Sequence, residues 1–155
     1  MRQLEPLDRA ISPAKFAHVV LRTKRLAELV SWYEMLLGAR VSFRNDFIAF
    51  LSYDDEHHRI AFVQNPSFAD RPENAVGLDH FAYTFTTLGE LLQTYKRLAA
   101  HGIQPFWCVN HGPTTSLYYR DPDGNRVELQ IDNFPDTAKL AAWFASGALA
   151  SNPLG

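Results

Sequence analysis

The stretch SLYYRDPDGNRVELQ, residues 116–130, predicts a β-hairpin on which the fold of the chain depends. An apolar and aromatic run leads into the tetrad Asp-Pro-Asp-Gly at 121–124, and a segment of alternating polar and apolar side chains follows. Proline presets φ at the first central position of the turn, and glycine accepts the positive φ that a tight turn requires. Because alternate residues of a strand share a face, Glu128 lies with Arg126 and Gln130, opposite Val127 and Leu129.

Tyr118 lies across this turn from Glu128, and we expect the two side chains on the same wall of the hairpin. A carboxylate and a phenol on one face of a strand pair indicate either a solvated sheet edge or the wall of a polar site. The hairpin alone leaves both interpretations open.

Around the hairpin, the chain shows two copies of one unit, strand–helix–strand–strand–strand. The segment FAHVVLRT matches DHFAYTF, and HRIAFVQ matches NRVELQI. An internal duplication of this size predicts an α+β fold in which two βαβββ modules lie in tandem and form a curved mixed sheet around a cavity, followed by a C-terminal helix. The expected strands are 15–22, 40–44, 47–52, 58–64, 78–85, 104–109, 116–120 and 126–132, and the expected helices are 24–37 and 87–101.

Composition places the chain in a broad class. Its 155 residues, 46% of them hydrophobic, suffice for one domain, with module one at about 14–65, a linker at 66–77, module two at 78–132 and the last helix at about 135–149. A net charge of −2 argues against nucleic-acid and membrane partners. A single cysteine excludes an intramolecular disulfide, and the first residues lack the apolar core of a secretory signal. We therefore expect a cytoplasmic protein.

Superposing the two units places His18 and His80 at equivalent points on their first strands, and Ala61 at the position that Glu128 holds in the second unit. Each histidine by itself also fits a core or edge residue bonded to the backbone. The matched positions favour a joint role, with His18, His80 and Glu128 converging on one cavity. Two imidazoles and one carboxylate form the ligand set of a non-haem Fe(II) site that leaves positions open for substrate and O₂.

The duplicated plan and these residues resemble the vicinal-oxygen-chelate superfamily, which includes glyoxalase I, fosfomycin and bleomycin resistance proteins and extradiol ring-cleaving dioxygenases. The resemblance covers about residues 14–134, and it is strongest to the catalytic domain of type I extradiol dioxygenases. It implies that His18, His80 in LDHFAY and Glu128 bind the metal. It also implies that Tyr118, ten residues before Glu128, hydrogen-bonds the substrate.

Two further histidines enter through the resemblance. His58, the second histidine of HHRIAF, takes the place of the acid–base residue of the family, although the pair His57-His58 by itself reads as two exposed histidines after an acidic turn. His111 in VNHGPTT lies nearer to Tyr118 than the corresponding histidine of the family. It either has a catalytic role or only turns the loop before Gly112.

The resemblance implies an extradiol dioxygenase that uses Fe(II), or Mn(II), to insert O₂ into a small catechol-type aromatic diol in aromatic catabolism. No counterpart of the extra N-terminal domain of two-domain relatives is recognised, so we expect a homo-oligomer in which another subunit completes the pocket. Two alternatives stay open. One is a glyoxalase I-like isomerase or lyase, whose usual four ligands conflict with Ala61; the other is a metal-free protein that binds an aromatic drug, which would not need His18, His80 and Glu128 together.

Overall fold

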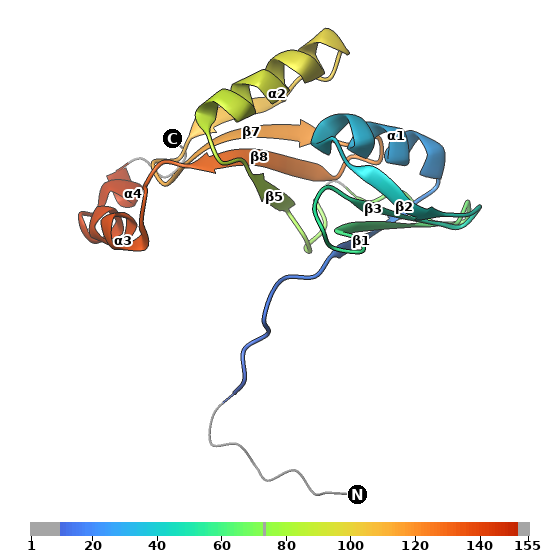
Figure 1. Cartoon of the computed structure of the whole chain (residues 1–155), viewed down its shortest axis with the longest axis horizontal. Coiled ribbons are helices and arrows are strands. Elements are labelled where there is room, and N and C mark those ends of the chain that lie inside the picture. The colour runs from blue at the N-terminus through green and yellow to red at the C-terminus, as the bar shows by residue number, and fades with distance from the viewer. Residues whose placement is uncertain (1–9, 73, 152–155) are drawn as a thin grey trace, which may run out of the picture.

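A computed structural model describes residues 10–72 and 74–151, and it confirms the predicted α+β fold (Figure 1). Each unit has the expected order of elements. The first consists of β1 (Val19–Thr23), α1 (Leu26–Leu37), β2 (Arg40–Arg44), β3 (Ile48–Ser52) and β4 (Ile60–Gln64). The second consists of β5 (His80–Thr84), α2 (Leu88–Ala100), β6 (Trp107–Asn110), β7 (Thr114–Arg120) and β8 (Arg126–Asp132), and α3 (Thr137–Ala145) and α4 (Ala148–Ser151) follow it.

The two units form two separate four-stranded sheets with the same topology, β1-β4-β3-β2 and β5-β8-β7-β6. In each sheet the first strand pairs in parallel with the fourth, and the other pairings are antiparallel. In Figure 1, α1 and α2 lie on the same side of the two sheets, while α3 and α4 lie beyond the end of β8 on the other side. We call the side of each sheet that α1 and α2 leave uncovered its open face.

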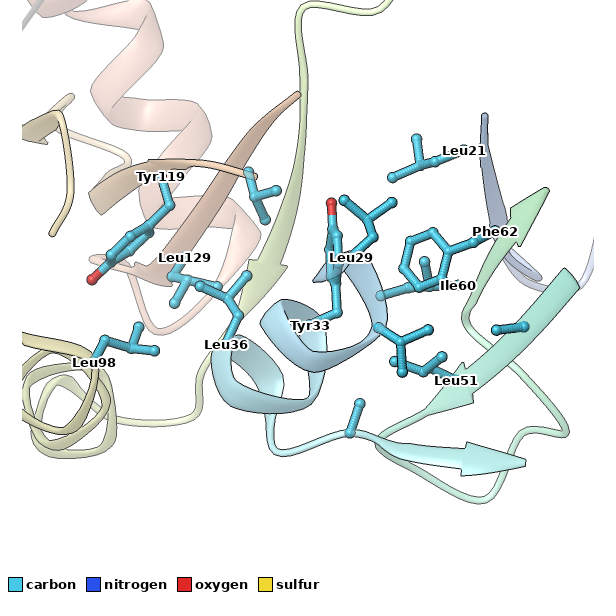
Figure 2. Close-up of a cluster of buried hydrophobic side chains, with 14 of the residues drawn as sticks. Leu21, Leu29, Tyr33, Leu36, Leu51, Ile60, Phe62, Leu98, Tyr119 and Leu129 are labelled. Atoms are coloured by element: carbon cyan, nitrogen blue, oxygen red, sulfur yellow. The ribbon is translucent and has the colours of Figure 1, made fainter. Parts of the chain in front are cut away.

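The core is one cluster that spans both units, with α1 between them (Figure 2). Leu29 and Tyr33 of α1 lie against the first sheet, where Tyr33 and Phe62 have ring centroids 5.2 Å apart. On the other side of α1, Leu36 points toward Leu129 of β8. Burying such side chains contributes about 1.5–3 kcal/mol each. Folding of the two units is therefore coupled through α1.

The Asp-Pro-Asp-Gly turn docks on the same helix. The hydroxyl of Tyr33 donates to Oδ2 of Asp121 over 3.1 Å, and Arg25 forms an ion pair of 3.0 Å with Asp123. Asp121 is only 5% exposed, and burial raises the pKa of its carboxyl. The turn that connects β7 to β8 thus also joins the two units.

Helix ends follow local chemistry. Helix α1 begins at Leu26, after Thr23 and Gln64 accept hydrogen bonds from the backbone N–H groups of Arg25 and Leu26. It ends before Gly38, whose φ of 63° is left-handed, as the sequence predicted. The capping box of Thr87 and Glu90 opens α2.

Most predicted elements are shifted by one to three residues at an end, and two differ more from those observed. Strand β1 begins at Val19 instead of residue 15, because Arg59 binds the carbonyl oxygens of Phe16 and Ala17 with its guanidinium. The single helix expected at 135–149 is two short helices, separated at Gly147 with a φ of 75°. Within residues 10–72 and 74–151, no helix has the length and apolar character needed to cross a bilayer.

Candidate active site

Glu128 lies on the open face of the second sheet and is 4% exposed, so it is not part of a solvated edge. Its neighbours in the sheet are Tyr118 of β7 and Ala82 of β5. Val127 and Leu129 point the other way, into the core. The alternation predicted from the sequence is therefore confirmed, and it places a buried carboxylate beside a phenol. Because a buried charge must be paired or bind a metal, this position requires an explanation.

The partner of Glu128 is His80, at the start of β5. Nε2 of His80 lies 3.0 Å from Oε2 of Glu128, and Nδ1 of His80 lies 2.7 Å from Oδ2 of Asp79. The hydrogen bond from His80 helps to lower the pKa of the Asp79 carboxyl, and Arg126 holds this carboxylate from the other side at 3.0 Å. A carboxylate on the second ring nitrogen fixes the orientation of a histidine, as it does for many metal-binding histidines.

Tyr118 is 6% exposed and completes this group. Its hydroxyl lies 3.1 Å from Nε2 of His111. The Trp107 ring stacks on the Tyr118 ring, with ring centroids 4.9 Å apart. Burial and, after it, the Glu128 carboxylate together raise the pKa of Tyr118 to about 12. The phenol therefore keeps its proton at neutral pH and can donate a hydrogen bond.

His18 and His58 form a second group, on the first unit. Their ring centroids are 4.4 Å apart, and Phe50 stacks on His58 at 4.4 Å with an interplanar angle of 13°. Burial lowers the pKa of His58, and the neighbouring rings of His18 and His57 lower it further. His58 thus favours the neutral imidazole, which is the form that accepts a proton.

A cavity of about 620 Å³ is lined by His18 but by none of the other predicted site residues. It lies between the first strands of the sheets, β1 and β5, and its lining is mostly apolar. His18 lines it from one side, and Ala82, the sheet partner of Glu128, lines it from the other. Tyr53 and Tyr83 meet edge to face in its wall, with centroids 5.5 Å apart.

The donor set fits a divalent transition metal in part. His80 and Glu128 supply one imidazole nitrogen and one carboxylate oxygen, and their separation of 3.0 Å suits two adjacent ligands of one ion, which lie roughly 3 Å apart when each bond is about 2.1 Å. His18 instead contacts His58. Across the described part of the chain, no three His, Cys, Asp or Glu side chains are grouped closely enough to hold a metal. The predicted set of three ligands stays a prediction.

Two residues of the site were not anticipated from the sequence. Asp79 holds His80, and its only sequence signal is the dipeptide Asp-His. Trp107 stacks on Tyr118 because the two residues are partners in the register of β6 and β7, which depends on the length of the loop between these strands.

Comparison with known proteins identifies the family. The model of the Glyoxalase/Bleomycin resistance protein/Dioxygenase superfamily matches residues 15–129. The chain belongs to this superfamily. The match runs through both βαβββ units as far as Leu129 of β8. It therefore covers all six predicted site residues, which are His18, His58, His80, His111, Tyr118 and Glu128.

Within the superfamily, two curated relatives come from Rhodococcus globerulus. Biphenyl-2,3-diol 1,2-dioxygenase 2 is 46% identical over 142 residues, which are 91% of this chain and 75% of that protein. Biphenyl-2,3-diol 1,2-dioxygenase 3 is 51% identical over 122 residues, 77% of this chain and 64% of that protein. A solved glyoxylase/bleomycin resistance protein/dioxygenase domain from Frankia sp. EAN1pec has a TM-score of 0.65 at 21% identity, covers 79% of this chain and 100% of that domain, and shows the shared fold.

Proposed function

We propose that this chain is an extradiol dioxygenase that inserts O₂ into a catechol-type aromatic diol and takes part in aromatic catabolism. The observation that carries the proposal is the buried Glu128, paired with His80 and adjacent to Tyr118. Two relatives at 46 and 51% identity are named as biphenyl-2,3-diol 1,2-dioxygenases, which supports the same reaction class here.

In this proposal His18, His80 and Glu128 hold Fe(II), or Mn(II) in its place. The chemistry that such an ion supplies is the activation of O₂ beside a bound diol. His80 and Glu128 already lie at the required separation. The ring of His18 would have to leave His58 and turn toward the cavity that it lines.

The remaining residues would orient the diol and accept its proton. Tyr118 keeps its proton and would donate a hydrogen bond to one oxygen of the diol, while His111 holds the hydroxyl of Tyr118 in place. His58 would accept the proton of a diol hydroxyl, because a neutral imidazole is a good base near neutral pH. Trp107 shields Tyr118 on one face, which limits the approach of water.

The cavity between β1 and β5 suggests the kind of diol. Val20, Leu78 and Phe81 contribute apolar surface to its volume of about 620 Å³. Such a wall favours a diol with an apolar substituent, and a second aromatic ring fits both this surface and the names of the relatives. We further infer a homo-oligomer, since Val20 and Phe43 are each about half exposed on the first sheet. A cytoplasmic location fits the single cysteine of the chain.

Anaerobic reconstitution with Fe(II), followed by a panel of diols in air, tests the proposal. The panel should contain catechol, 3-methylcatechol and 2,3-dihydroxybiphenyl, and it should be followed by the visible absorbance of ring-opened products together with O₂ uptake. Equal amounts of product and consumed O₂ would support the proposal, and a preference for 2,3-dihydroxybiphenyl would support the assignment of the cavity. Metal bound at one equivalent without product from any diol would contradict it.

A further inference from the structure

The loop between β6 and β7, which carries His111, is held by the segment that follows β8. Asn133 is central to this contact. Its side-chain Nδ2 donates to the carbonyl oxygen of Gly112 at 2.8 Å and to Oδ1 of Asn110 at 3.2 Å, and its backbone N–H donates to the carbonyl oxygen of Pro113 at 2.8 Å. Asn133, next to the strand of Glu128, therefore bonds to residues on both sides of His111.

Trp143 of α3 covers the same loop. A Cβ at residue 112 would lie 2.7 Å from Cη2 of Trp143, and closer still to Cζ2, so only glycine leaves room for the indole. Gly112 also has a φ of 91°, which favours glycine independently. The Phe134 ring also packs against this indole, with ring centroids 6.1 Å apart. Asp136 caps the start of α3, because its side chain accepts a hydrogen bond from the backbone N–H of Lys139.

This contact is one residue away from the site. His111, adjacent to Gly112, donates its backbone N–H to the carbonyl oxygen of Thr114, and its ring lies 3.1 Å from the hydroxyl of Tyr118. The edge of His111 meets Trp107 at a centroid distance of 5.3 Å. A shift of Gly112 would therefore change the hydrogen bond between His111 and Tyr118, which depends steeply on distance and angle.

We propose that Trp143 and Asn133 are positioning residues, and that the C-terminal segment holds His111 against the hydroxyl of Tyr118. The proposal rests on the function proposed above. The indole of Trp143 packs on Gly112, Phe134 and Phe144, none of which is a proposed metal ligand or substrate-binding residue. Replacing Trp143 should therefore lower kcat, because His111 shifts, and should leave KM largely unchanged. Helix α3, to which the sequence assigned no role, becomes a support of the active site in this proposal.

The test compares four single variants and one double variant of the full chain. Trp143→Ala removes the indole, Trp143→Phe keeps an aromatic ring, and Gly112→Ala drives a methyl group into the indole. Gly102→Ala is the matched control, because Gly102 has a φ of 76° and nothing within 4 Å of the added Cβ. Gly112→Ala combined with Trp143→Ala removes the collision and keeps the backbone strain.

Two readouts are required. Hydrogen exchange of the peptide that contains residues 108–116, measured by mass spectrometry, reports on the loop without any turnover. Steady-state kinetics with the best diol separate kcat from KM. We expect Trp143→Ala to speed exchange of this peptide and to lower kcat about tenfold or more with KM within about twofold, in the range of lost supporting contacts. Trp143→Phe should recover most of both, and Gly102→Ala should change neither.

The double variant gives the sharpest outcome. If the indole and residue 112 are in contact, Gly112→Ala with Trp143→Ala should be less damaging than the product of the two single effects. Wild-type exchange and kcat in Trp143→Ala would overturn the proposal, as would a change in KM alone. A chain that converts no diol would refute the proposed function, while the exchange results would still decide whether the C-terminal segment holds the loop.

Discussion

The open faces of the two sheets have the same backbone and opposite chemistry. Ala61 and Glu128 are equivalent positions, because Ala61 pairs with Val20 in the first sheet as Glu128 pairs with Ala82 in the second. One strand further, Phe50 lies opposite Ala61, and Tyr118 lies opposite Glu128.

The difference therefore lies in the side chains at matched positions. An alanine and a phenylalanine make the first face apolar, and a glutamate and a tyrosine make the second a polar site. The next matched position is aromatic in both sheets, since Phe43 lies opposite Phe50 and Trp107 lies opposite Tyr118. The same backbone arrangement occurs twice, and the side chains at two matched positions give only the second face a carboxylate and a phenol. The first unit contributes His18 and His58 to the candidate site instead.

The largest expected effect is the loss of metal and activity from the polar face. Glu128→Ala and His80→Ala should each abolish stoichiometric Fe(II) binding, and His18→Ala should do so if its ring turns toward the cavity. Loss of activity should exceed the roughly 10–100-fold effect of removing an outer hydrogen-bond partner. Metal analysis and circular dichroism measure binding and folding, and Glu34→Ala, on the exposed side of α1, is the control. Stoichiometric metal in all three variants would eliminate the ligand set.

The next prediction concerns the contribution of the first unit to catalysis. His58→Phe should retain the metal and lower kcat by about 10²–10⁴-fold, the usual contribution of a general acid or base. His101→Phe is the matched control, because the His101 side chain bonds to the carbonyl oxygen of Arg97 at the end of α2 and is not a predicted site residue. Unchanged turnover in His58→Phe would remove His58 as the acid–base residue.

Ala61→Glu tests whether the two faces differ only in their side chains. Ala61 is 2% exposed, and Val20 and Phe50 beside it offer no hydrogen-bond donors from their side chains. An unpaired buried charge should lower the free energy of unfolding by about 3–5 kcal/mol, measured by urea denaturation at pH 7. Ala61→Gln has the same size without the charge and should cost less. Equal stability of the two variants would mean that His18 can pair with a carboxylate as His80 does.

A smaller effect is expected at the joint between the units. Tyr33→Phe removes the hydroxyl that donates to Asp121 and leaves a buried carboxylate with fewer donors. The free energy of unfolding should fall by about 1–3 kcal/mol, the cost of an unsatisfied buried group. Tyr53→Phe is the control, because the Tyr53 hydroxyl has no hydrogen-bond partner among residues 10–72 and 74–151. A drop in the control as large as in Tyr33→Phe would show that the hydroxyl at residue 33 has no special role.

The smallest effect is a pH dependence at the same joint. Burial raises the folded-state pKa of Asp121 above its unfolded value of about 3.9, so the folded state binds this proton more tightly. Its contribution to stability is present below that value and is lost as the pH rises through the folded pKa. Asp121→Asn cannot titrate. The stability of the wild type relative to Asp121→Asn should therefore decrease from pH 4 toward neutral pH, and a difference independent of pH would contradict this assignment.

Much of the frame could be predicted from the sequence. The strands at 40–44 and 126–132 have their predicted bounds, and the turn at 121–124 joins two strands as expected. These features depend on the alternation of side chains and on proline and glycine, which act within a few residues. The role of Trp143 could not be predicted in this way, because its contact with Gly112 joins residues on different elements.

The sequence by itself determined the repeat and the Asp-Pro-Asp-Gly turn. It also determined that His18 is equivalent to His80 and Ala61 to Glu128, since these equivalences follow from local patterns that occur twice. Only the tertiary structure decided that Glu128 is buried and bonded to His80, 48 positions earlier in the chain, and that His18 rests on His58. The physical reason is that the parallel register of β5 with β8 and the docking of the Asp-Pro-Asp-Gly turn on α1 arise from packing between distant elements. Local propensity does not encode which side chains that packing brings together.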